Sequence, residues 1–561
     1  MVIVDTSFKR IQELIKEKIS IEELGQVLSD LGMELDNVEG DEIKIEITAE
    51  RIDLITPEGL ARAVNCYKGF TKKYEEVKLS TEKNNYVHKV DSSVKEYRPY
   101  TRSFVVKGLT FVDENIKSLM WIQEKIHDTY GRKRKKVAIG VYNLNKVNFP
   151  ITYTVKKPEE IKFVPLGMNT IMNGREILQK HPTGKNYASL LEGFEYYPLQ
   201  IDAKGQVLSL PPIINSDNLG KIDNQTKDIF VECTGPDEDS LDNVLNILAT
   251  MFYDWGGKIF SVKIESENGV FVCPSLKTRD ETINIKTIKN LIGLDLKPNE
   301  VVELLQKMEY SVLKTEGEKI TVKIPSIRTD IWHEVDIADD VARGYGYNNI
   351  VPTLPNVSTI GNMLPLNILI EDICNFLIGF NLIELKTFAL TNHQDQFEKM
   401  NLVVEEYVSL GKNTQDQNLN MVRKWLLPEL IKALVANRNK EYPQNVFEIG
   451  TVIIPDNKKD VRARNVDKLT CLVCEDKTDF TKIKQVLDSI MSFLDLEYEI
   501  KETEHNSFIP GRVGRVLIQG KESGIVGEIS PEVLEKWDLK MPLAGLELDL
   551  SKILKLLTLK K

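Results

Sequence analysis

The sequence predicts an α+β protein of several domains: two small modules of one design, a mixed α/β segment between them, and a segment of alternating strands and helices after the second. Three observations lead to this prediction. The chain has 561 residues, whereas a domain usually has about 100–200. A segment near the N-terminus recurs in the second half of the chain at a constant offset. The last third alternates strand-like and helix-like patterns.

The duplication is visible within this one sequence. Residues 11–53 recur at 288–330, so that each matched position lies 277 residues further along. Apolar residues first recur with a spacing of about 3.6, which predicts two amphipathic helices, and then alternate after Gly40 or Gly317, which predicts a strand. We expect each copy to fold as helix, helix, turn, strand and closing helix, a winged-helix-like module. Such modules bind nucleic acid in some proteins, but a fold alone does not fix function.

The composition is that of an ordinary globular chain, with 42% apolar and 28% charged residues and a net charge of -11. This acidic balance argues against a protein that coats nucleic acid non-specifically, which needs a basic surface. One basic run, GRKRKK at 131–136, stands against this background. We interpret the run as a solvated loop, and a local contact with nucleic acid stays open as the alternative.

Six cysteines are spread along the chain, which is no disulfide framework and favours a reducing compartment. Cys471 and Cys474 lie three positions apart in an expected strand, so they face opposite sides and are not expected to share a metal. The chain has no run of about 18 apolar residues and no secretory leader at its start. We therefore expect a cytoplasmic protein that does not span a membrane.

Several longer motifs follow one another along the chain. RIDLITPEGLAR (51–62) and RTDIWHEVDIADDVARGYGY (328–347) close the two repeats. HPTGKNYASLL, SLPPIINSDNLGKI and IFVECTGPD lie between them, and SFIPGRVGRVLIQGKESGIVGEISPEVLEKWDL lies near the C-terminus. In this order the motifs resemble the repeat signatures, the editing domain and the synthetase-like domain of phenylalanyl-tRNA synthetase beta subunits of the archaeal and eukaryotic type. The resemblance covers essentially the whole chain.

The resemblance implies a winged-helix-like repeat module (1–85), an α/β tRNA-editing domain (86–272), a second such module with an acidic helix (273–352) and a degenerate class II synthetase-like domain built on an antiparallel sheet (353–561). It also implies a ligase that attaches phenylalanine to tRNA(Phe) with ATP and magnesium, as an (αβ)2 heterotetramer. ATP and phenylalanine are then bound by the alpha subunit, and this chain has no catalytic residue for ligation. The alternative functions are a stand-alone aminoacyl-tRNA hydrolase and a non-enzymatic RNA-binding scaffold.

Editing has to discriminate tyrosine from phenylalanine by one hydroxyl, which an apolar pocket rejects only about a hundredfold. Glu232 and Thr234 offer a carboxylate for the phenol and a small polar group for the ester, and their i, i+2 spacing puts both on one strand face. We expect Ser209 and Asn215 to complete the wall. His181 is a candidate for orienting the ester or the tRNA terminus, with a structural role as the favoured alternative. The expected nucleophile is water.

An acidic helix follows the second repeat. Asp336, Asp339 and Asp340 share a helix face, and Asp330 lies just upstream. Like charges at this spacing destabilise a helix by about 0.2–0.5 kcal/mol, so a positive group is expected beside them. Carboxylate oxygens suit Mg²⁺, and the resemblance implies magnesium at these four residues. A solvated acidic face, or pairing with neighbouring arginines, is an equal alternative.

The C-terminal domain resembles a class II active site that has lost its residues. Arg423 precedes an expected helix, and Phe447 and Glu448 lie in an expected strand. In an active site of this class, arginines hold the ATP phosphates and acidic residues hold magnesium. The full set is not visible, so the resemblance implies a catalytic relic that packs against the alpha subunit. A helix facing the core is predicted by the stripe Leu426, Leu427, Leu430 and Leu434.

Overall fold

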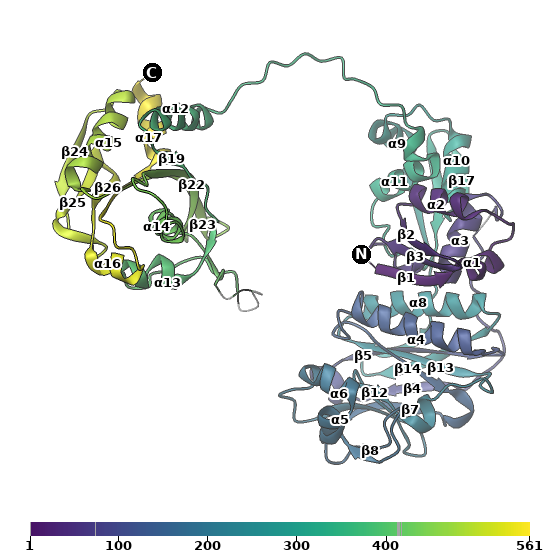
Figure 1. Cartoon of the computed structure of the whole chain (residues 1–561). Helices are drawn as coiled ribbons and strands as arrows, with labels where there is room; N and C mark the ends of the chain where they lie inside the picture. The colour runs from purple at the N-terminus through teal and green to yellow at the C-terminus, as the bar shows by residue number, and fades with distance from the viewer. Residues whose placement is uncertain (1, 73, 412–415, 417, 561) are drawn as a thin grey trace. The chain divides into compact units, whose positions relative to one another are not determined.

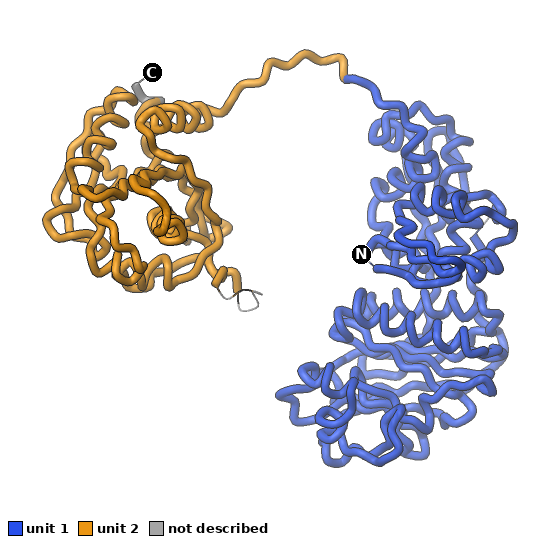
Figure 2. The backbone as a smooth tube through the Cα atoms, in the orientation of Figure 1, with its two compact units in different colours: residues 1–354 blue, residues 355–561 orange. Residues whose placement is uncertain are grey.

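The computed structural model describes all residues except 1, 73, 412–415, 417 and 561. The chain divides into two compact units, residues 1–354 and 355–561, which Figure 2 colours separately. Among the described residues, no helix has the length and apolar character needed to cross a membrane.

The first unit contains two modules with the same order of elements (Figure 1). The first consists of β1 (Val2–Ser7), α1 (Phe8–Leu14), α2 (Ile21–Asp30), β2 (Glu34–Glu39), β3 (Glu42–Ile47) and α3 (Pro57–Tyr67). The second consists of β16 (Arg279–Asn284), α9 (Ile285–Ile292), α10 (Pro298–Lys307), β17 (Ser311–Glu316), β18 (Lys319–Ile324) and α11 (Glu334–Tyr345). Their antiparallel sheets have the orders β1-β3-β2 and β16-β18-β17. The predicted duplication is therefore confirmed by the order of elements.

Each module differs from the prediction in having three strands where one was expected. The predicted strand corresponds to β3 and β18, whose apolar residues alternate inward. The hairpin partners β2 and β17 keep most of their residues at the surface, so they carry no apolar alternation that a sequence pattern detects. The opening strands β1 and β16 lie before the residues in which the duplication is visible. The prediction of one strand was therefore wrong for a physical reason.

Local sequence signals set where the helices begin. Ser20 accepts a hydrogen bond from the backbone of Glu23, whose side chain returns one to Ser20, so α2 opens with a capping box. Thr56 caps α3, and Pro57 occupies its first turn, where a missing N–H costs nothing. The apolar helix faces bury themselves in one hydrophobic core that runs through both modules and the segment between them.

The segment between the modules is built on a ten-stranded sheet of order β12-β11-β10-β7-β4-β14-β5-β13-β6, with β15 paired to β14. Its strands are β4 (Val87–Val90), β5 (Tyr100–Lys107), β6 (Ala138–Asn143), β7 (Ile151–Lys156), β10 (Tyr197–Ile201), β11 (Val207–Leu210), β12 (Ile214–Asn215), β13 (Ile229–Gly235), β14 (Lys258–Ser266) and β15 (Gly269–Cys273). The helices α4 (Asp113–Asp128) and α8 (Glu238–Asp254) pack on one face (Figure 1). The sheet is curled, as a contact between its two edge strands shows: the hydroxyl of Tyr142 on β6 donates to Asn215 on β12.

Smaller elements complete this segment. They are the strand pair β8 (Lys162–Phe163) and β9 (Met172–Asn173) and the helices α5 (Gly174–Lys180), α6 (Pro182–Tyr187) and α7 (Asp217–Gly220). They surround a separate small apolar core beside the sheet. The curled end of the sheet is thereby fixed in place.

The second unit is built on a seven-stranded sheet of order β19-β22-β23-β27-β26-β25-β24, antiparallel except for the parallel pair β19 and β22. Its strands are β19 (Ile383–Glu384), β22 (Val446–Pro455), β23 (Ala463–Cys474), β24 (Tyr498–Glu502), β25 (Phe508–Ile518), β26 (Lys521–Ile529) and β27 (Leu543–Asp549), with a separate pair β20 (Leu390–Thr391) and β21 (Met421–Val422). Its helices are α12 (Pro365–Gly379), α13 (His393–Gln396), α14 (Leu427–Ala436), α15 (Phe480–Phe493), α16 (Pro531–Lys536) and α17 (Leu550–Lys560). The chain is thus a mixed α/β protein with several sheets.

Strand β23 carries the two closely spaced cysteines, and both are buried as free thiols. Cys471 packs into the apolar core that contains α15, whereas Cys474 packs into the core that contains α14. The two thiols therefore lie on opposite faces of the sheet, as their spacing predicts.

Candidate functional site

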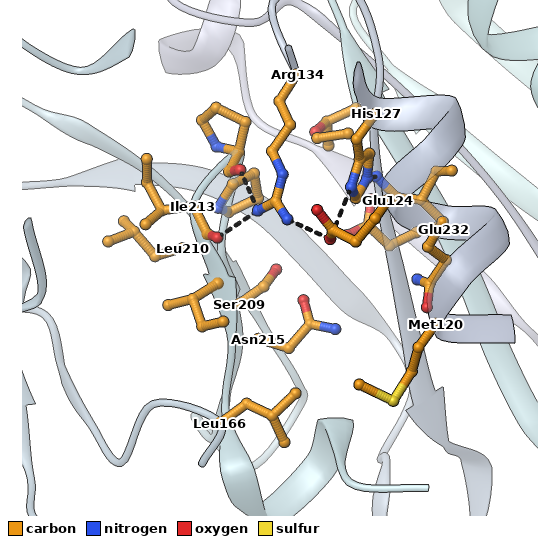
Figure 3. Close-up of a pocket in the computed structure, with 17 residues that line it drawn as sticks. Met120, Glu124, His127, Arg134, Leu166, Ser209, Leu210, Ile213, Asn215 and Glu232 are labelled. Carbon is orange, nitrogen blue, oxygen red and sulfur yellow. Dashed lines mark hydrogen bonds and ion pairs between the residues drawn. The ribbon is translucent and has the colours of Figure 1, made fainter. Parts of the chain in front are cut away.

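A cavity of about 140 Å³ opens between α4 and the curled sheet of the first unit (Figure 3). Its lining comes from α4, from β6 and β13, and from the turn between β11 and β12. Both members of the predicted strand-face pair reach the cavity, which confirms that they share a face. Four of the five predicted editing residues line it: Ser209, Asn215, Glu232 and Thr234.

His181 lies outside this lining. It caps α6, where its Nδ1 accepts a hydrogen bond from the Thr183 N–H at 3.2 Å, and its Nε2 lies 3.2 Å from the carbonyl oxygen of Leu166. Since Nδ1 accepts, Nε2 carries the proton and donates to that carbonyl. Leu166 lines the cavity, so His181 supports the wall from behind. Its role toward the ester stays a prediction.

The strand register explains how polar residues far apart in the sequence meet. Ser209 is paired with Gln200 on β10 and with Asn215 on β12, and directly paired residues present their side chains on the same face. Glu232 is paired with Gly140 on β6 in the other arm of the sheet. Because the sheet curls, the polar row on β10, β11 and β12 faces the row that contains Glu232.

Glu232 is the buried centre of this arrangement, with 3% of its surface exposed. Burial raises the pKa of its carboxyl to about 7. Tyr142 donates its hydroxyl to Oε1 at 2.9 Å, and a side chain at Gly140 would collide with both groups. Oε2, Ser209 Oγ and both amide atoms of Gln200 make no hydrogen bond of good geometry with a described residue, although Gln200 lies close enough to Glu232 to oppose the rise in its pKa. Buried polar atoms of this kind call for a ligand or water.

Two buried arginines fix the shape of the cavity: Arg98, which no sequence motif marks, and Arg134, which belongs to the basic run 131–136 but is buried and not solvated. Arg98 donates to the carbonyl oxygens of Arg134 at 3.0 Å and Lys135 at 3.1 Å, and also to that of Thr234. Arg134 donates to the carbonyl oxygen of Ile213 at 2.7 Å and to a glutamate of α4 at 2.6 Å. The two guanidinium groups therefore tie β13, the basic loop after α4 and the turn after β11 to one another.

The four predicted magnesium ligands lie on or just before α11, but their carboxylates go to different donors. Asp330 and Asp340 both hold Arg328, whose Nη2 is 2.7 Å and 2.6 Å from their Oδ2 atoms. Asp336 accepts two backbone N–H groups just before the helix. Asp339 accepts from the arginine one turn later at 2.8 Å. The pairing alternative is therefore present in the structure.

The donor chemistry at α11 suits magnesium, but the arrangement does not supply a full set of protein ligands. Within the described residues, no group of three or more His, Cys, Asp or Glu is placed to hold a metal ion. Asp336 and Asp339 are partly exposed, and magnesium usually takes one or two carboxylates and keeps several waters. The fit is limited to these two residues, and the magnesium site stays a prediction.

In the second unit, Arg423 and Glu448 face one another. Arg423 Nη1 lies 2.7 Å from Glu448 Oε1, and both side chains are buried. The hydroxyl of Thr387 donates to the other carboxylate oxygen at 2.5 Å. The arginine is therefore neutralised by a carboxylate of its own chain. The predicted stripe of leucines is fully buried on and just before α14.

Models of three families match separate parts of the chain. Residues 1–70 match the Phe-tRNA synthetase beta subunit B1 domain, and residues 281–347 match the tRNA synthetase B5 domain. Residues 350–550 match the phenylalanyl tRNA synthetase beta chain CLM domain. Both repeated modules and the second unit are therefore recognised independently.

Whole-chain relatives agree with these matches. The phenylalanine–tRNA ligase beta subunit of Pyrococcus furiosus is 38% identical over 552 residues, covering 97% of this chain and 98% of that protein. That of Archaeoglobus fulgidus is 38% identical over 524 residues, covering 93% of each. A crystal structure of an N-terminal fragment of the beta subunit from Pyrococcus horikoshii, 35% identical, superposes with a TM-score of 0.59 over 61% of this chain and 99% of the fragment. The chain therefore belongs to the family of phenylalanine–tRNA ligase beta subunits.

Proposed function

We propose that this chain is the ligase subunit that removes tyrosine wrongly attached to tRNA(Phe). The observation that carries the proposal is the cavity in which Glu232, whose Oε2 makes no hydrogen bond of good geometry with a described residue, lies beside Ser209 and Thr234. A phenol donates a hydrogen bond, and the carboxyl group of a glutamate has an oxygen that accepts one. A buried hydroxyl without a partner costs about 1–3 kcal/mol, so a pocket that supplies this partner selects tyrosine.

Water is the nucleophile in this proposal. Among the described lining residues, His127 is the histidine, and its Nε2 already accepts the backbone N–H of Ile139 at 2.8 Å. It is therefore not placed to activate Ser209 or Thr234 as a covalent nucleophile. The polar wall instead orients water and the ester carbonyl, and closure by the RNA strand excludes bulk solvent.

Ligation itself is assigned to an alpha subunit, in an (αβ)2 complex that binds ATP, phenylalanine and tRNA(Phe) in the cytoplasm. In this proposal residues 1–85 and 273–352 are winged-helix-like modules, 86–272 is the editing domain and 353–561 is the class II synthetase-like relic. The internal pairing of Arg423 with Glu448 supports the relic, because a phosphate-binding arginine has to be available to its ligand. Large apolar side chains exposed on the second unit support a protein partner there.

Magnesium belongs to the ATP-dependent reaction of the complex, and we also propose it at α11. There it is held by Asp336 and Asp339, after these carboxylates exchange their present donors for the ion. Asp330 and Asp340 remain with Arg328. The ion supplies charge compensation on an acidic helix face, and no step of editing depends on it.

The deciding experiment is deacylation of preformed tyrosyl-tRNA(Phe) by the co-expressed complex. Glu232→Ala is expected to slow hydrolysis at least tenfold, which corresponds to about 1.4 kcal/mol in the transition state, and to leave phenylalanine charging unchanged. Glu195→Ala, an exposed glutamate of the same segment, is the matched control. Equal rates in wild type and Glu232→Ala refute the pocket assignment.

The same co-expressed complex distinguishes the proposed function from its two alternatives. A stand-alone hydrolase deacylates tyrosyl-tRNA without an alpha subunit and has no use for the second unit. A non-enzymatic scaffold binds tRNA but does not hydrolyse the ester. Hydrolysis by the complex, together with charging that needs both subunits, excludes both.

A further inference from the structure

The basic loop 131–136 has an unusual backbone for its composition. Arg132, Lys133 and Arg134 are three consecutive residues in the left-handed region, with φ of 49°, 53° and 63°. Each such residue that is not glycine costs roughly 1–2 kcal/mol, so a run of three needs an external hold. Backbone N–H groups of all three donate to carbonyls at the end of α4, and Arg98 holds the carbonyls of the last loop positions.

These hydrogen bonds fix the directions in which the side chains of the loop point. The side chain of Arg134 turns inward to the cavity wall (Figure 3), whereas Arg132, Lys133 and Lys135 are exposed. No ion pair joins these three cations to a described residue, although the chain as a whole carries a net charge of -11. Three unpaired cations therefore project beside the cavity from a backbone that is pinned to the cavity wall.

A second cavity lies on the other side of the loop. It measures about 420 Å³ and is lined by Arg132, Lys136 and Tyr130 together with residues of the first module. The loop thus separates the small polar pocket from a larger cleft that has cations and an aromatic ring at its edge. Such a combination is typical of surfaces that bind single-stranded nucleic acid.

Cavity size indicates what has to lie on this loop. Pockets that enclose a drug-sized ligand measure about 300–1,000 Å³, whereas the pocket beside Glu232 measures about 140 Å³. It has room for an amino-acid side chain but not for the nucleotide that carries it. The ribose and the phosphodiesters of that strand therefore have to lie outside the pocket, and the loop that supplies Arg134 to the pocket wall carries exposed cations that can meet them.

We propose that Arg132, Lys133 and Lys135 form the docking site for the phosphodiesters of the single-stranded RNA end that carries the ester into the pocket. This inference rests on the proposed editing function for its biological meaning, but the binding it states is independent of hydrolysis. The rigid loop holds the cations in place before the RNA arrives, which lowers the ordering cost of binding.

The test measures RNA binding by the co-expressed complex, using a 5′-fluorescein acceptor-stem minihelix with a single-stranded CCA end. Gln at positions 132, 133 and 135 (Arg132→Gln, Lys133→Gln, Lys135→Gln) keeps an unbranched polar side chain and the backbone strain but removes the charge. Each phosphate contact contributes about 0.7 to the slope of log K against log salt for a single strand. We expect the slope to fall by about 2 and affinity at moderate salt to fall by about 10- to 100-fold.

Two controls make the result specific. The variant Lys44→Gln, Lys286→Gln, Lys319→Gln removes three exposed lysines of the repeat modules and changes net charge equally, but is expected to bind as wild type. Swapping Arg and Lys within the loop is expected to retain affinity. Unchanged slope and affinity in the loop variant, or equal losses in the lysine control, overturn the proposal. Loss of alpha-subunit assembly in the loop variant also overturns it, because the loop is then a protein interface.

Failure of the editing function gives a different result. If wild type does not deacylate tyrosyl-tRNA(Phe) while the loop variant still loses minihelix binding, the proposed function falls and the docking site stands. If Glu232→Ala abolishes deacylation but the loop variant binds and deacylates as wild type does, the proposed docking site is wrong and the proposed editing function is supported.

Discussion

Arg51 and Arg328, equivalent residues of the two repeats, hold the aspartate two positions ahead in the same way. Nε donates to Oδ1 at 3.0 Å and 2.9 Å, and Nη2 donates to Oδ2 at 2.8 Å and 2.7 Å. The third partner differs: Arg51 reaches Glu309 of the other module, whereas Arg328 reaches Asp340 on α11 of its own module. The duplication has therefore preserved a buried bidentate ion pair and changed what surrounds it.

Breaking one of these pairs should destabilise the first unit strongly. Asp53→Ala removes two of the three side-chain hydrogen bonds of the buried Arg51, and removal of one partner of a buried pair typically costs about 3–5 kcal/mol. We expect a loss of this size in urea unfolding followed by circular dichroism. Asp5→Ala, an exposed aspartate of β1, is the control, and a loss below about 1 kcal/mol for Asp53→Ala contradicts the prediction.

Removing the hydroxyl of Tyr142 should destabilise the fold, because this hydroxyl is the donor to Glu232. Tyr142→Phe leaves a buried carboxylate oxygen without its donor, which costs about 1–3 kcal/mol. The change is measured as a shift in the unfolding midpoint in urea. Tyr196→Phe, a half-exposed tyrosine whose ring faces Lys157, should shift it little. Equal shifts in both variants would show that the Tyr142–Glu232 hydrogen bond does not contribute to the stability of the fold.

Stability should depend on pH through Glu232. Its folded pKa of about 7 lies above its ordinary value of 4.5, so the folded state retains the proton and its contribution is fully present below about pH 4.5. As the pH rises toward 7 this contribution to the free energy of unfolding is lost, and its size is on the order of 3 kcal/mol. Glu232→Gln removes the titration, so the stability of the variant relative to wild type should rise between pH 5 and pH 7 and then level off. A constant difference across that range contradicts the buried carboxyl.

Magnesium should stabilise the chain if the acidic helix binds it. Adding Mg²⁺ after chelator treatment is expected to raise the melting temperature by mass action, and Asp339→Asn should blunt the rise. Glu334→Gln, at the start of the same helix, is the charge-matched control. Melting temperatures that do not change with Mg²⁺ in any of the three proteins would contradict the site and leave Asp336 with its backbone donors and Asp339 with Arg343.

Assembly should depend on the apolar surface of the second unit. Phe388 has 83% of its surface exposed, and a charge there opposes burial under a partner subunit. Phe388→Asp is expected to reduce recovery of the alpha subunit on co-purification, read by the mass of the eluted complex. Phe194→Asp, at an exposed position of the first unit, should assemble normally. Full recovery with Phe388→Asp places the interface elsewhere.

The sequence predicts those parts of the site that local periodicity can reach. Glu232 and Thr234 were paired correctly because i, i+2 residues of one strand share a face. Tyr142 and Arg98 could not be found this way, since only the register of β13 with β6 and β5 brings them to the pocket. Gly140 allows the Tyr142 hydroxyl and the Glu232 carboxyl to lie close to the backbone, but the sequence does not show which side chains lie there without the strand register.

The same limit applies to the fold. The duplication predicted the repeated helices, because their buried faces impose a period, but it missed β2, whose exposed residues follow none. The four aspartates of the second module were grouped by spacing alone. Their separate donors depend on the turn before α11, which spacing does not describe.

The left-handed run at 132–134 has a consequence for engineering. Glycine adopts that backbone region without steric cost, so glycine in place of the exposed Arg132 or Lys133 would release about 1 kcal/mol of strain at each position, whereas glycine at Arg134 would also remove its hydrogen bonds to the cavity wall. The most direct route to a more heat-resistant chain thus leads through the residues that carry the loop's charge. A library selected for thermal tolerance alone would tend to erase this loop, and a library selected for accurate protein synthesis would keep it.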